Sequence, residues 1–348
     1  MGKKPNIIIV LADDMGFSDI GCFGSEIRTP CLDAMAAQGI RYNHMYNNAR
    51  CCPSRASLLT GLYPHQAGVG LMMENLGIKE YQGYLNDSCI TLAEGVKSAG
   101  YQTGMIGKWH VGGGYQKTRE ALERAGKKGY PTPMQRGFDY FYGTLEGAGN
   151  YYNPVTLMEN GEWINIRPED NFYYTEKIGE KACEALERFS GDDVPFFLYV
   201  SFNAPHWPLH AREEDIAAYE GTYLVGWDEI RKRRYQKQLE MGIVKDIWDM
   251  SPRDTGSPDW DEIEDWEDIK MAVYAAQIEE MDREIGKIRE KLTQLELEKD
   301  TFILFTSDNG ACAEELPEDG WICNFASERT LNGEKVEIGN LSKRRPGK

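Results

Sequence analysis

Chemically reactive side chains follow four strongly apolar segments of the sequence. In chain order these residues are Asp13 and Asp14, then Lys108 and His110, then His206, and finally Asp308 and Asn309. Carboxylates, amides, lysines and histidines bind ions and transfer protons. Loops are commonly polar as well, so the pattern by itself also permits a purely structural role for these residues.

The four apolar segments predict strands that are buried on both faces. They cover residues 6–11, 101–106, 195–202 and 301–306 and are rich in β-branched and aromatic residues. Helices are expected between Thr29-Pro30 and Gly39, and over residues 91–99, 175–189 and 269–297. This alternation predicts an α/β fold with a largely parallel central sheet sandwiched by helices. In such sheets ligands bind beyond the carboxyl ends of the strands, so the polar groups are expected to converge there.

Composition and charge exclude several classes of function. The 348 residues are 41% hydrophobic and 11% aromatic, which is enough for a sizeable core. No run approaches the roughly 20 apolar residues that span a bilayer, so no membrane partner is expected. Lys and Arg number 39 against 56 Asp and Glu, and the net charge of -17 argues against nucleic acid as a partner. An anionic substrate must therefore be held by local groups.

Cysteine spacing and the start of the chain bear on the cellular compartment. The eight cysteines are scattered and show no spacing typical of a structural zinc site or of a disulfide scaffold. The apolar run near the start ends at Asp13-Asp14 and lacks the long core and cleavage site of a signal peptide. The chain as given is therefore expected to be cytoplasmic, or periplasmic or secreted if a leader was removed.

One segment, at about 212–268, is interpreted as an acidic insertion in a single α/β domain that covers residues 1–348. Between positions 259 and 268 it carries a dense set of Asp and Glu side chains with Trp260 and Trp266 among them. A solvated acidic face with two packing aromatic residues is favoured over a binding patch.

The segment at 51–61, CCPSRASLLTG, is the most specific pattern in the chain. Pro53 favours a helix over Ser54–Leu59 that begins just after Cys51, which would place Cys51 at the positive end of that helix, where anions are stabilised. Taken alone, Cys51 could equally be a buried structural cysteine beside a helix cap. The residues that fill the pattern C-x-P-S-R-x-x-x-L-T-G are Cys51, Pro53, Ser54, Arg55, Leu59, Thr60 and Gly61. This pattern resembles the signature of the type I, formylglycine-dependent sulfatases.

The resemblance to the sulfatases extends from Pro5 to about Glu315. Successive segments that resemble family motifs are PNIIIVLADDMG, GLYPHQAGV, GKWHVG, APHWPL and TSDNG. APHWPLHA and the segment 219–243 are most similar to the bacterial arylsulfatase branch. The resemblance implies a fold of the alkaline phosphatase-like superfamily and a single sulfatase-type catalytic domain.

The resemblance also implies a modified nucleophile and a metal ion. In this family the matching cysteine, here Cys51, is oxidised to Cα-formylglycine by a formylglycine-generating enzyme or an anaerobic sulfatase-maturating enzyme. When the metal ligands of the family are carried over by position, one divalent cation would be bound by Asp13, Asp14, Asp308 and Asn309 together with the modified Cys51. Oxygen donors of this kind suit calcium, or less often magnesium.

The implied reaction is hydrolysis of a sulfate ester to an alcohol and sulfate. The aldehyde hydrate derived from Cys51 would attack sulfur, while the cation, Arg55 and Lys108 would stabilise the developing charge. His206 would protonate the leaving alcohol, and His110 would take a proton from the remaining hydroxyl to release sulfate. A small aryl, alkyl or carbohydrate sulfate is the expected substrate.

Two alternative functions stay open at this stage. Relatives with the same core and signature hydrolyse phosphonate or phosphate diesters, so this chain could do the same. A non-catalytic protein that binds sulfated glycans is the other alternative, and it would apply if Cys51 is unmodified.

The sequence departs from the family pattern near its C-terminal end. Sulfatases continue after the Asp-Asn-Gly turn to a second active-site lysine and then to a smaller subdomain built on an antiparallel sheet. Lys335, Lys343 and Lys348 lack the motif that surrounds this lysine in the family. We therefore expect the chain to lack the second lysine and the C-terminal subdomain, to turn over poorly and to associate through the uncovered face.

Overall fold

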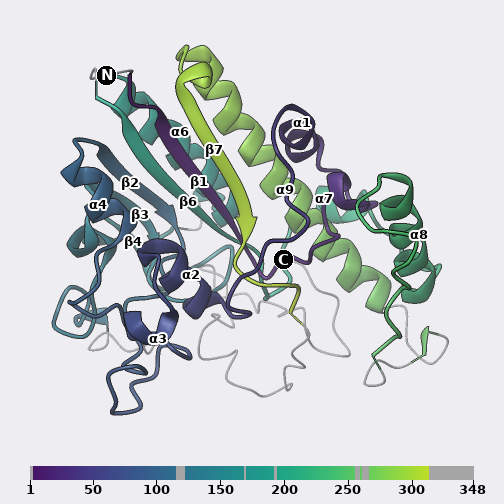
Figure 1. Ribbon diagram of the computed structural model, residues 1–348, viewed down its shortest axis with the longest axis horizontal. Coiled ribbons are helices and arrows are strands. Elements are labelled where there is room, and N and C mark those ends of the chain that lie inside the picture. Colours follow the sequence, from purple (N-terminus) through teal and green to yellow (C-terminus); the bar gives the residue numbers. More distant parts are fainter. Residues whose placement is uncertain are drawn as a thin grey trace.

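The computed structural model describes residues 3–114, 122–167, 170–191, 194–254, 259–260 and 266–312. Figure 1 shows a central sheet with helices on both sides. The strands are β1 (Asn6–Asp13), β2 (Gln102–Gly107), β3 (Tyr140–Thr144), β4 (Leu157–Glu159), β5 (Glu162–Trp163), β6 (Phe196–Pro205) and β7 (Thr301–Ser307). The α-helices are α1 (Pro30–Gln38), α2 (Cys51–Thr60), α3 (Pro64–Ala67), α4 (Leu92–Ser98), α6 (Tyr174–Ser190), α7 (Glu213–Ala217), α8 (Trp227–Glu240) and α9 (Trp266–Gln294).

The sheet has the strand order β5-β4-β3-β2-β6-β1-β7. β1 pairs in parallel with β6 and β7, and β2 pairs in parallel with β6 and β3. The short strands β4 and β5 run antiparallel at one edge. The predicted α/β class with a largely parallel sheet is therefore confirmed, and the four predicted strands are β1, β2, β6 and β7.

Alternation along the central strands divides the core into two halves. In β1, Ile8 and Val10 pack into one apolar cluster, whereas Ile9 and Leu11 pack into the other. The first cluster includes the apolar faces of α6 and α9, and the second includes residues of α2 and α4. A strand covered on both faces has to be apolar at every position, which explains the continuous run NIIIVL.

The helix boundaries follow the local signals with one difference. Helix α1 begins at Pro30 and α4 begins after Thr91, whose hydroxyl accepts from the Glu94 backbone N–H at 3.1 Å. Helix α2 begins at Cys51 itself rather than after it, because the Ser54 N–H already donates to the carbonyl of Arg50 at 2.9 Å. Pro53 lies within the first turn, where its missing N–H costs nothing.

The predicted acidic insertion contains α7 and α8. Arg234 of α8 lies 2.5 Å from Asp19 and 2.7 Å from Glu26, so this helix is tied to the loop after β1. Trp260 packs edge-to-face on Trp227 with ring centroids 5.3 Å apart. Residues 255–258 and 261–265 lie outside the described residues, and so do Lys335, Lys343 and Lys348. No helix in the described part of the chain is both long and apolar enough to cross a bilayer.

Candidate active site

The carboxyl ends of four adjacent parallel strands meet at one edge of the sheet (Figure 1). Gly107 at the end of β2 is paired with Ser201 of β6, and Ala12 of β1 is paired with Ser307 of β7. This register places Lys108, Asp13 and Asp308 at the same level of neighbouring strands. Strand order and register thus bring together segments that are far apart in the sequence.

A buried cluster of two carboxylates and two cations lies directly beyond these strand ends. The Lys108 ammonium donates to Oδ2 of Asp13. Nη2 of Arg55 lies 3.2 Å from Oδ1 of Asp13 and 2.8 Å from Oδ2 of Asp308. None of the four side chains is more than 2% exposed. Because two negative and two positive charges lie in contact, the cluster can be buried without a net charge.

The electrostatics of this cluster favour the binding of additional positive charge. Burial, together with the neighbouring carboxylate of Asp13, raises the pKa of Asp308 to about 7. Burial also opposes the charge of Lys108, but contact with Asp13 outweighs it and raises the pKa of Lys108. A divalent cation beside Asp13 and Asp308 would favour the ionised form of Asp308.

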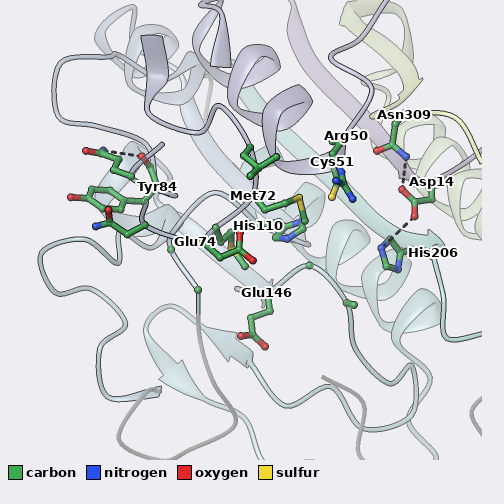
Figure 2. A pocket seen from close by; sticks show the side chains of 18 of the residues that line it. Asp14, Arg50, Cys51, Met72, Glu74, Tyr84, His110, Glu146, His206 and Asn309 are labelled. Carbon is green, nitrogen blue, oxygen red and sulfur yellow. Dashed lines mark hydrogen bonds and ion pairs between the residues drawn. The ribbon is translucent and has the colours of Figure 1, made fainter. Parts of the chain in front are cut away.

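Asp14 borders the cavity next to His206 and Asn309 (Figure 2). Its backbone has a positive φ of 60°, and its N–H donates to Oδ1 of Asp308 at 3.2 Å. The carboxylate accepts a hydrogen bond from the Asn309 amide and lies 3.3 Å from Nε2 of His206. Asp14 therefore links the turn after β7 to His206 after β6.

The donor set fits a divalent cation. Asp13, Asp14 and His206 each offer a ligand atom, and these atoms lie within 4.8 Å of one another. Oδ1 of Asn309 is buried and has no hydrogen-bond partner among the described residues. Three carboxylates and an unpartnered amide oxygen are hard donors of the kind that calcium and magnesium prefer. Asp13, Asp14, Asp308 and Asn309 therefore could hold such an ion.

Cys51 is the first residue of α2 and lies beside Cys52 and His110. A hydrogen bond from the Cys52 thiol, and the nearby His110 and Lys108, lower the pKa of Cys51 well below its usual value. Burial lowers the pKa of His110 to about 4, so its ring is neutral at pH 7. The His110 imidazole contacts the thiol and also lies against Gly147, where an added Cβ would come within 2.1 Å of the ring. This setting stabilises negative charge at the Cys51 position.

His206 follows the last residue of β6 and is held through both ring nitrogens. Nδ1 lies 2.6 Å from the carbonyl oxygen of Trp207, and Nε2 lies 3.3 Å from Asp14. Both neighbouring atoms are acceptors, so a ring that carries protons on both nitrogens can donate to each of them. The geometry therefore suits a residue that gives a proton to a bound group.

Arg55 lies beneath the cavity and contacts the buried carboxylates. Its guanidinium donates to Asp308 and to the Lys108 carbonyl, and also to the Ser201 hydroxyl. It therefore neutralises the carboxylates beneath the site. Ser201 lies inside a buried strand, and no sequence signal pointed to its contact with Arg55.

Cys51 and Asp14 open onto one cavity of about 1730 Å³ (Figure 2). Cys51, His110, Asp14, His206 and Asn309 line one part of it, whereas Lys108 and Arg55 are buried behind its wall. Figure 2 shows further lining side chains that sequence reasoning missed, namely Arg50, Met72, Glu74, Tyr84 and Glu146. These residues lie in loops outside the matched motifs, so only the fold reveals them.

Comparison with known proteins assigns the chain to a family. A family model described as Sulfatase matches residues 5–341. An uncharacterized sulfatase of Schizosaccharomyces pombe is 36% identical over 324 residues, which cover 89% of this chain and 58% of that protein. An arylsulfatase of Klebsiella aerogenes is 34% identical over 333 residues, which cover 89% of this chain and 67% of that protein. The chain belongs to the sulfatase family, as the sequence motifs predicted.

Solved structures agree with this assignment. A putative sulfatase from Bacteroides fragilis is 25% identical and superimposes with a TM-score of 0.66, covering 90% of this chain and 63% of that one. Ps i-CgsB, solved in complex with k-i-k-neocarrahexaose, is 27% identical with a TM-score of 0.63, and the match covers 88% and 59% of the two chains. A phosphonate monoester hydrolase of Agrobacterium radiobacter, at 18% identity and a TM-score of 0.51, shows the shared fold alone. The chain thus spans roughly three fifths of the length of these relatives.

Proposed function

We propose that the protein hydrolyses sulfate esters to an alcohol and sulfate. The observation that carries this proposal is the position of Cys51 within the sulfatase signature, at the start of α2 and in the same cavity as Asp14, His206 and Asn309. Its 34% identity to an arylsulfatase supports the same activity. Sulfatases generally use a formylglycine and a divalent metal ion, and both have residues here that fit them.

In this proposal Cys51 is converted to formylglycine by a maturating enzyme, and the hydrated aldehyde supplies the nucleophile. The positive end of the ten-residue helix α2 favours an anion beside this position. Lys108 lies close enough to Cys51 to lower the pKa of its thiol, and the same positive charge would attract a sulfate group. The chain therefore offers an anion site at the nucleophile despite its overall negative charge.

Asp13, Asp14, Asp308 and Asn309 would hold one calcium ion, which would supply positive charge next to the sulfuryl oxygens. Arg55 and Lys108 contact the buried carboxylates of Asp13 and Asp308 and hold them in place. His206 would donate a proton to the leaving oxygen, since its Nε2 borders the cavity beside Asp14. His110, neutral and in contact with Cys51, would accept the proton that releases sulfate.

For the substrate we propose a small aryl, alkyl or carbohydrate sulfate. The cavity of about 1730 Å³ exceeds the roughly 300–1,000 Å³ of a typical small-molecule site, so a saccharide would fit as well as an aromatic ring. Its lining includes carboxylates, such as Glu74 and Glu146, that can accept hydrogen bonds from hydroxyl groups.

Removal of the metal ion is expected to abolish turnover of an aryl sulfate. The cation would supply the positive charge next to the sulfuryl oxygens, because Lys108 and Arg55 are already paired with Asp13 and Asp308. The measurement is turnover after chelation and dialysis, with the metal content checked by elemental analysis. Calcium should restore turnover better than magnesium, since calcium accepts carboxylate and amide oxygens in flexible geometry whereas magnesium demands a near-ideal octahedron. Undiminished turnover by a verified metal-free protein would contradict the metal assignment.

The function itself is tested by comparing an aryl sulfate with an aryl phosphonate as substrates for the matured protein. We expect the sulfate to be preferred and the variant Cys51→Ala to lose turnover of both. Cys183→Ala is the matched control, because Cys183 lies on α6 in the other half of the core. If the matured protein preferred the phosphonate, phosphonate hydrolysis would replace sulfate-ester hydrolysis as its function. Turnover by Cys51→Ala would exclude Cys51 as the nucleophile.

A further inference from the structure

A second group of potential metal ligands lies beside the oxygen cluster. The sulfur atoms of Cys51 and Cys52 and a ring nitrogen of His110 lie within 4.8 Å of one another. The three residues are buried, with exposures of 7%, 0% and 4%. Sequence spacing gave no hint of this group, because His110 follows β2 and the cysteines begin α2. The fold alone brings the three side chains together.

The chemistry of this group differs from that of the neighbouring oxygen cluster. Two thiols and an imidazole are soft and borderline donors, which favour zinc over calcium or magnesium. Around a tetrahedral zinc ion such donor atoms lie roughly 3.5 Å apart. Small side-chain rotations would therefore bring the three atoms to bonding distance.

The surroundings supply the other requirements of a zinc site. Cys51 and Cys52 are consecutive residues in the first turn of α2, so their two sulfur atoms are held on one rigid element next to His110. Nδ1 of His110 is buried and has no hydrogen-bond partner within the described part of the chain. Cys51 and His110 both line the cavity, which gives an entry path and room for a water molecule as fourth ligand. Lys108 lies close to Cys51 and opposes a cation here, so zinc would have to displace the thiol protons of both cysteines, and the two thiolates formed would then offset the single charge of Lys108.

We propose that the unmodified chain binds one zinc ion through Cys51, Cys52 and His110. Conversion of Cys51 to formylglycine removes its sulfur atom, so the site exists only before this modification. While bound, zinc would hold Cys51 as a thiolate and withhold it from oxidation. Zinc binding does not depend on the proposed function, whereas the effect on maturation rests on it.

Cobalt is the probe for the binding site, because cobalt–thiolate coordination gives a charge-transfer absorption that oxygen ligands do not give. Protein produced without a maturating enzyme and stripped of metal should bind one equivalent of cobalt with this absorption, and zinc should displace it. Cys52→Ala and His110→Ala should each weaken zinc binding at least about 10-fold. Losing a residue that only hydrogen-bonds to a metal ligand already weakens metal affinity by about this factor, and Cys52 and His110 are proposed as direct ligands. Cys183→Ala should leave zinc binding unchanged. Circular dichroism verifies that each variant is folded.

Two results would overturn the zinc site. One is the absence of the thiolate absorption in the wild-type protein, and the other is unchanged zinc affinity in both folded ligand variants. The effect on maturation is tested by incubating zinc-loaded and zinc-free protein with a maturating enzyme and measuring conversion of Cys51 by mass spectrometry. Conversion should fall in the loaded sample, and equal conversion would overturn this effect. No conversion in either sample would also overturn this effect while leaving the zinc site intact, and the proposed function is judged separately by turnover of the matured protein.

Discussion

Replacing Asp13 by alanine is expected to destabilise the protein as well as abolish turnover. Asp13 is fully buried and contacts both Lys108 and Arg55. Without it the Lys108 ammonium keeps its burial and loses its partner, which typically costs about 3–5 kcal/mol. Urea unfolding monitored by circular dichroism measures this loss in the free energy of unfolding.

Asp14→Ala is the matched control for this prediction. Asp14 is also a proposed metal ligand, but its described partners are Asn309 and His206 rather than a buried lysine or arginine. We expect it to abolish turnover with a smaller loss of stability, on the order of 1–3 kcal/mol for the unpaired polar groups. An Asp13→Ala protein as stable as Asp14→Ala would contradict the described ion-pair cluster. Near-normal turnover by either variant at saturating calcium would exclude that residue from the metal site.

Replacing His206 by alanine is expected to impair poor leaving groups far more than good ones. Positioned proton donors contribute about 10²- to 10⁴-fold to rates, and an activated aryl sulfate needs little of this help. Nε2 of His206 borders the cavity beside Asp14, where a leaving oxygen would have to lie. The measurement is kcat/KM over a series of aryl sulfates whose phenols differ in acidity.

His110→Ala provides the contrast, because His110 contacts Cys51 rather than the carboxylate side of the cavity. This variant should slow sulfate release, so that the mass of the intact protein shows an accumulated sulfated intermediate. Equal losses along the leaving-group series in His206→Ala would contradict its role as proton donor. The absence of any sulfated species in His110→Ala, at a reduced rate, would contradict the role of His110.

The central fold was predictable because each buried strand is apolar at nearly every position. β1 and β6 pack on helices on both faces, so their composition identifies them without knowledge of the topology. The edge strands β4 and β5 have only three and two residues and carry no comparable signal. Their pairing depends on β3, which has five residues and was not predicted either.

The site was predictable to the extent that its residues follow strand ends or lie in the matched motifs. Asp13, Lys108, His206 and Asp308 come together because strand order places β1, β2, β6 and β7 side by side. Their contacts were not predictable, because they depend on rotamers and on partners more than 50 residues away. The turn of Arg55 toward Asp308 and the group formed by Cys52 with His110 are such cases.

Mass spectrometry of the peptide that contains Cys51 shows directly whether this residue becomes formylglycine. The protein is produced with and without a formylglycine-generating enzyme and digested, and the peptide is sequenced by fragmentation. We expect position 51 to lose its sulfur and gain an aldehyde only in the first sample, while the adjacent Cys52 keeps its thiol as an internal control. A Cys51 thiol that stays intact in both samples would contradict the proposed nucleophile, and with it the proposed sulfatase activity.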